Sequence, residues 1–113
     1  MTAAALDAKL WYWQRISAMA LAVCVIVHLG VIVYVTRGGL TAAELLGRTR
    51  GNGLFAAFYV TFVAACAIHV PIGLSTIARE WLGWRRRASF ALATIITTII
   101  LALGMRAVYA VTA

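Results

Sequence analysis

The chain has 113 residues, of which 65% are hydrophobic and only 12% are charged. Soluble domains typically have about 45–50% apolar and about 25% charged residues. A soluble fold of this size could not bury so much apolar surface, which excludes soluble enzymes, DNA-binding domains and disulfide-stapled secreted domains. The net charge of +7 is best explained by loop arginines that face lipid headgroups. The composition indicates a membrane protein that binds no nucleic acid.

Three stretches without formal charge, 17–35, 54–78 and 88–105, are long enough to cross the hydrocarbon core as helices. With aromatic residues before the first stretch and Arg106 after the third, we predict spans at about 13–36, 54–78 and 88–110. The predicted fold is an all-α membrane protein with three transmembrane helices in a single anchor domain, 1–113, that forms part of a larger helical bundle. In the first loop, Thr41-Ala-Ala-Glu44 has the pattern of a capping box and predicts a short surface helix over 42–46.

Positive charges near the spans predict the orientation of the chain. One side has six of them, and the other has four: Lys9, Arg15, Arg79, Arg85, Arg86 and Arg87 against Arg37, Arg48, Arg50 and Arg106. Because Lys and Arg are enriched in cytoplasmic loops, we expect a cytoplasmic N-terminus and an outward C-terminus. The predicted location is the bacterial cytoplasmic (inner) membrane.

His28 and His69 are the only histidines, and both lie well inside predicted spans. An ionisable side chain is costly in hydrocarbon and by default marks a functional site. We expect haem iron as the partner, because neutral imidazole is a good iron ligand and a haem is apolar enough to lie between helices. Zinc would need more ligands, and no other His, Asp or Glu lies at membrane depth.

The residues after His69 favour a haem site. Gly73 lies one turn further on the same helix face, where the absence of a side chain would leave room for a flat macrocycle. Pro71 removes a backbone donor and crowds the carbonyl of Ala67, which should bend the helix there. A simple kink with small-residue packing would also explain Pro71 and Gly73, but it would leave His69 unexplained.

His28 shares a helix face with Ser17, Leu21, Cys24 and Ile32. Two arrangements of the histidines are open: both hold one haem, or each ligates its own haem together with a histidine from another subunit. We interpret Cys24 and Cys66 as small packing residues, because they form no Cys-x-x-Cys pattern. An alternative interpretation of the whole chain is a cofactor-free structural membrane subunit that only anchors or assembles a complex, with its histidines bonded to neighbouring helices.

Two short motifs resemble those of a known family. The segment from Gln14 to Ala18, Gln-Arg-Ile-Ser-Ala, resembles the Arg-x-Ser-Gly motif of the cytochrome b membrane-anchor subunits of succinate dehydrogenase and fumarate reductase, complex II. The segment from His69 to Gly73, His-Val-Pro-Ile-Gly, followed by Arg79-Glu80, resembles the His-x-x-x-Gly-x-Arg-x-x-x-x-Asp stretch of the same subunits. Ala18, Ser75 and Glu80 replace the glycine, arginine and aspartate of these motifs.

This resemblance implies a membrane anchor that binds haem b and passes electrons between an iron–sulfur subunit and membrane quinone. The chain itself would be a non-catalytic subunit of a succinate:quinone-type oxidoreductase. It implies as partners a flavoprotein subunit, an iron–sulfur subunit and a second membrane-anchor subunit, or another copy of this chain. His69 falls on the haem-ligand position, and His28 resembles the first-span histidine of the two-haem branch. Arg15 and Ser17 fall on the motif at the quinone end, where a guanidinium and a hydroxyl can hydrogen-bond a quinone oxygen.

Overall fold

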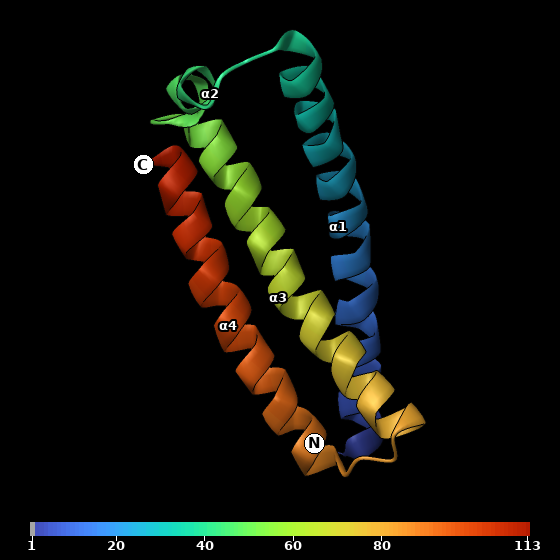
Figure 1. Cartoon of the computed structure of the whole chain (residues 1–113). Helices are drawn as coiled ribbons and strands as arrows, with labels where there is room; N and C mark the ends of the chain where they lie inside the picture. Colours follow the sequence, from blue (N-terminus) through green and yellow to red (C-terminus); the bar gives the residue numbers. More distant parts are fainter. Residues whose placement is uncertain (1) are drawn as a thin grey trace.

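A computed structural model describes residues 2–113 as four helices joined by short turns (Figure 1). The helices are α1 (Ala3–Gly38), α2 (Ala42–Thr49), α3 (Gly53–Trp81) and α4 (Arg86–Thr112). By length and hydropathy, α1, α3 and α4 can each cross a membrane. This confirms the predicted all-α, three-span fold. Each long helix extends beyond the predicted span at both ends.

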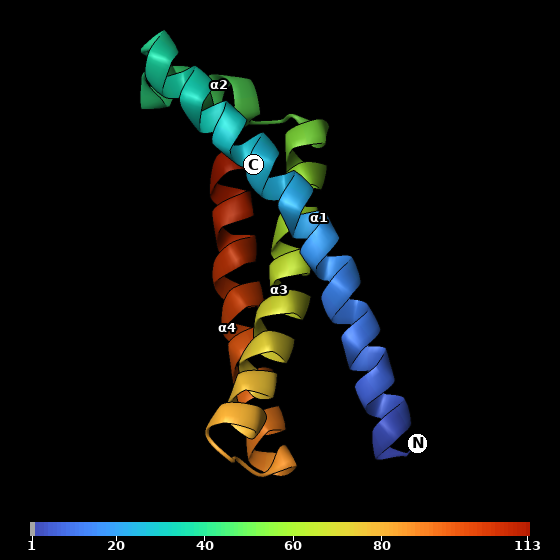
Figure 2. The same ribbon diagram turned by 90° about the vertical axis from the view of Figure 1, so that its right-hand side faces the viewer.

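The helix α3 is the centre of the molecule, because it packs against both α1 and α4. Figure 1 shows α1 close to α3 near the N-terminus and further from it toward the end that carries α2. Figure 2 shows that α1 crosses the other two long helices at an angle. The small helix α2 and the C-terminus lie at the end where α1 diverges. At this end α1 has separated from α3, while α3 and α4 stay side by side (Figure 1).

Small residues allow α3 and α4 to pack closely. A Cβ atom at Gly104 would lie 2.6 Å from Cγ1 of Val63, so this position in α4 has no room for a side chain. The buried residues of α3 are also small, and they include Ala65, Ala67, Ser75 and Ala78. In a membrane, van der Waals packing of this kind is a main source of helix association.

Pro71 leaves one carbonyl of α3 without its usual helical donor. Proline has no N–H, so the Ala67 oxygen loses the bond that it would receive from position 71. Instead, the Thr97 hydroxyl of α4 donates to the Ala67 oxygen at 3.5 Å. A side chain on the neighbouring helix thus satisfies the carbonyl, which is how spanning helices tolerate proline.

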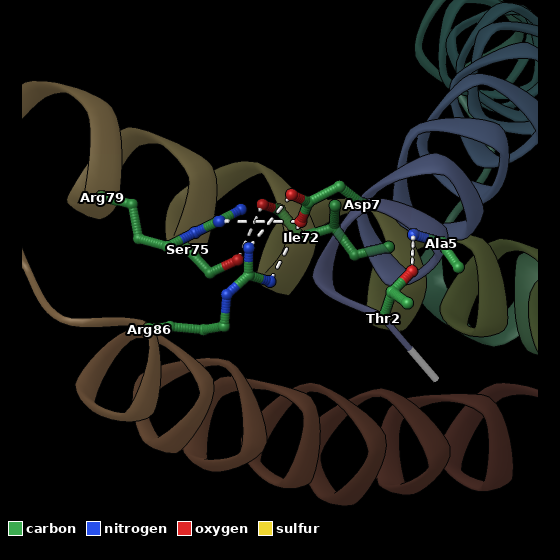
Figure 3. Close-up of polar contacts among 7 residues, drawn as sticks. All are labelled: Thr2, Ala5, Asp7, Ile72, Ser75, Arg79 and Arg86. Carbon is green, nitrogen blue, oxygen red and sulfur yellow. Dashed lines mark hydrogen bonds and ion pairs between the residues drawn. The ribbon is translucent and has the colours of Figure 1, made fainter.

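At the N-terminal end, one carboxylate links the three long helices. Asp7 of α1 accepts two hydrogen bonds of 3.0 Å from the Arg86 guanidinium of α4. Its oxygen also lies 3.7 Å from the Arg79 guanidinium of α3 (Figure 3). The Arg86 hydrogen bonds are the main reason why the pKa of Asp7 lies below its usual range. Sequence analysis did not predict this cluster.

At the opposite end, α2 is held by its own cap and by the end of α4. The Thr41 hydroxyl accepts from the Glu44 N–H at 3.2 Å, while the Glu44 carboxylate accepts from the Thr41 N–H at 2.8 Å. This confirms the predicted capping box, although the helix continues three residues past 46 to Thr49. After α2, the Gly51 N–H donates to the Thr112 carbonyl at 2.9 Å, and Gly51 has a φ of 69° that favours glycine.

Candidate functional site

His69 faces α1 and contacts Ser17. The Nδ1 atom of His69 lies 3.4 Å from the Ser17 hydroxyl, and only 3% of Ser17 is exposed. The same hydroxyl lies 3.0 Å from the Gln14 carbonyl of its own helix. His69 and Ser17 are therefore direct neighbours between α1 and α3. The sequence predicted them for two different sites, His69 as a haem ligand and Ser17 as a quinone-site residue.

Gly73 also faces α1, and its missing side chain makes room for Gln14. A Cβ atom at position 73 would lie 3.2 Å from the Gln14 amide nitrogen. The other end of that amide, the Oε1 atom, is buried without a hydrogen-bond partner among residues 2–113. Sequence analysis gave Gln14 no role, although its position three residues before Ser17 places it on the same helix face.

His28 lies in different surroundings, further along α1 toward the end of the molecule that carries α2. Its ring meets those of Tyr59 and Phe62 edge to face, with centroids 5.9 and 5.6 Å away. Its Nδ1 atom is buried and has no hydrogen-bond partner in the described part of the chain. The residue lines a largely apolar cavity of about 470 Å³ between α1, α3 and α4, which α2 covers at one end through Leu45 and Leu46.

The structure separates the two histidines. Ser17 marks the level of His69, and His28 lies eleven residues further along α1, which is about 16 Å of helix. The structure therefore does not bring His28 and His69 together at one place between the helices. The shared face of Ser17 and His28 is confirmed, because both contact α3.

Arg15 does not share the Ser17 environment. Its guanidinium lies 4.7 Å from the centre of the Trp11 ring, on the exposed surface of α1. Because Ser17 is buried and faces α3, the two residues point to different sides of α1. The structure therefore does not gather Arg15 and Ser17 around a single pocket of this chain.

Both cysteines are free, as expected from their spacing. Cys24 is buried in α1, and Cys66 is half-buried in α3. In the positive run at the start of α4, Arg86 is bound to Asp7, while Arg85 and Arg87 are exposed.

These features define a multi-pass helical membrane protein with two histidines between its spanning helices. Residues 1–104 match the family model described as succinate dehydrogenase/fumarate reductase transmembrane subunit. The chain belongs to this family, which confirms the resemblance seen in its motifs. The family implies a membrane complex with flavoprotein and iron–sulfur subunits. Searches of curated proteins and of solved structures gave no match.

Proposed function

We propose that this chain is the haem b-binding membrane-anchor subunit of a succinate dehydrogenase/fumarate reductase-like complex, and that it takes part in electron transfer between the iron–sulfur subunit and membrane quinone. The observation that carries the proposal is His28, an imidazole on the wall of an apolar cavity with a buried nitrogen that has no hydrogen-bond partner within the described residues 2–113. An apolar wall with one nitrogen ligand suits a haem. His69, half-buried between α1 and α3, is the ligand of a separate site.

When bound, haem b would supply a one-electron carrier inside the membrane. Each site offers one histidine from this chain, so the second ligand of each iron would come from a second membrane-anchor subunit or another copy of the chain. Arg15 and Ser17 follow Asp7 by about two to three turns in the N-terminal half of α1. We assign this end to quinone reduction and to the cytoplasmic side, where the exposed Arg85 and Arg87 would face the iron–sulfur subunit.

The test is a reduced-minus-oxidised spectrum of the purified complex. His69→Ala should abolish or weaken a low-spin haem signal, because the iron loses a nitrogen ligand that hydrocarbon cannot replace. Cys66→Ala, three residues earlier on the same helix, is the matched control and should leave the spectrum unchanged. An unaltered spectrum in His69→Ala would disprove the ligand assignment.

The quinone end is tested in the same preparation with Arg15→Leu. This variant should keep the haem spectrum and the reduction of a soluble dye, which takes electrons upstream, but should lose quinone reduction. Equal loss of both activities would indicate failed assembly instead of a quinone role.

One observation favours the alternative, a cofactor-free anchor. In this chain Ser17 already gives His69 a polar partner, and Gln14 fills the space above Gly73. A wild-type complex that is fully assembled and has no haem band would support that alternative.

A further inference from the structure

The Ser17 hydroxyl has one proton and two polar neighbours. One neighbour is the Gln14 carbonyl at 3.0 Å, which can only accept a hydrogen bond. Ser17 therefore donates its proton to that carbonyl. The contact of 3.4 Å with His69 must then run the other way, with the histidine Nδ1–H donating to the Ser17 oxygen. A neutral imidazole carries only one N–H, so Nε2 is left with a free lone pair.

We propose that Ser17 is a positioning residue for His69: it holds the ring in the Nδ1–H tautomer and makes Nε2 the nitrogen that is available to a metal. The proposal of a tautomer needs only this chain, while the role toward iron rests on the proposed function. It gives Ser17 a task that is independent of any contact with quinone.

The position of Ser17 suits this task. With 3% of the residue exposed, its hydroxyl is sheltered from competing water. The side chain is anchored to its own helix through the Gln14 carbonyl, so the acceptor oxygen has a fixed direction. A ligand histidine commonly donates its second ring N–H to such an acceptor, which fixes the ring orientation and raises the basicity of the coordinating nitrogen.

Ser75 offers a matched control. It is also a buried serine, with 2% exposed, and its hydroxyl donates to the carbonyl three residues earlier, that of Ile72, at 3.0 Å. It repeats the local arrangement of Ser17 without a contact to a histidine ring. A Ser→Ala change at either position removes the same group from the same kind of site.

The first measurement uses haem-free protein with ¹⁵N-labelled histidine, in which nitrogen chemical shifts distinguish a protonated from a bare ring nitrogen. Signals are assigned with the His69→Ala variant. At a pH where the ring is neutral, His69 should have a protonated Nδ1 and a bare Nε2. Ser17→Ala should shift the population toward the Nε2–H tautomer, and Ser75→Ala should not. A wild-type His69 with its proton on Nε2 would overturn the proposal without any variant being needed.

The second measurement uses the assembled complex. Loss of the Nδ1 hydrogen bond makes the ligand less basic, so Ser17→Ala should raise the haem midpoint potential and shift its paramagnetic resonance signal. Ser17→Thr, which keeps the hydroxyl, should restore both, and Ser75→Ala should change neither. Unchanged values in Ser17→Ala would overturn the role toward iron. A wild-type complex without haem but with the expected tautomer would instead reject the proposed function and leave the tautomer assignment standing.

Discussion

His28 combines two properties that are unfavourable in a merely structural residue. Its Nδ1 atom is buried without a hydrogen-bond partner among residues 2–113, and its ring lines a cavity. A buried polar group without a hydrogen bond costs about 1–3 kcal/mol of stability. The chain therefore carries at this position a group that stabilises the isolated subunit little and to which a ligand in the cavity would supply a partner.

Replacing His28 with Phe tests this interpretation. The change roughly keeps the ring volume and removes both nitrogens, so we expect one haem to be lost or to become high-spin while the His69 site keeps its own. The haem-free protein should be no less stable to heat, because an unsatisfied nitrogen is removed. Tyr59→Phe, which keeps the ring next to His28, is the control for packing. An unchanged haem content per complex would make His28 structural.

At the scale of the element, α3 depends on α4 for one of its backbone hydrogen bonds. The Thr97 hydroxyl donates to the Ala67 carbonyl, which receives no hydrogen bond from position 71 because proline has no N–H. Pro71 of α3 thus depends on the Thr97 side chain of α4. The hydrogen bond between the two helices lies close to the turn of α3 that carries His69.

The coupling can be measured with a double-mutant cycle. Thr97→Val keeps the shape and removes the hydroxyl, so it should lower the free energy of unfolding by about 0.5–1.5 kcal/mol. In a Pro71→Ala background the cost should shrink, because the N–H at position 71 can then bond the Ala67 carbonyl. Unfolding in mixed detergent micelles gives both values. Thr94→Val, whose hydroxyl bonds the Phe90 carbonyl of its own helix, is the control. An equal cost of Thr97→Val in both backgrounds would contradict the coupling.

Features that depend on neighbouring residues could be predicted from the sequence, and features that depend on helix register could not. The Thr41–Glu44 capping box and the common face of Ser17 and His28 follow from spacing along one helix. The contact of the Gln14 side chain with Gly73 depends on the position of α1 along the axis of α3. No residue pattern within either helix specifies this axial offset. The separation of His28 from His69 depends on the same offset.

At the scale of the whole molecule, the Asp7 cluster closes the bundle at its N-terminal end. Asp7 joins α1 to Arg79 of α3 and Arg86 of α4, although the nearer of these arginines in the chain is 72 residues away. The hydrogen bonds from Arg86 lower the pKa of the Asp7 carboxyl, and they raise the pKa of Arg86 in turn. The carboxylate is half exposed, so solvent screens the interaction and its contribution is modest.

The pH dependence of this contribution has a definite sign. Because the folded-state pKa of Asp7 is lowered, its stabilisation is fully present above the usual value of 3.8 and is lost as the pH falls through the lower folded-state value. Asp7→Asn should therefore reduce thermal stability slightly at pH 7, and the difference should shrink in high salt and below about pH 4. Glu80→Gln, an exposed carboxylate near the same end, is the control. A difference that stays constant from pH 7 to pH 3 would exclude the ion-pair explanation.

The contact between Gly104 and Val63 has a consequence for how this chain can vary. Both residues line the His28 cavity, and the missing methyl group at position 104 sets how closely α4 approaches α3 there. Any larger residue at 104 must either widen the gap between the helices or be matched by a smaller residue at 63. We therefore expect substitutions at the two positions to be compatible only in matched pairs. A change at one position without the other alters the dimensions of the cavity.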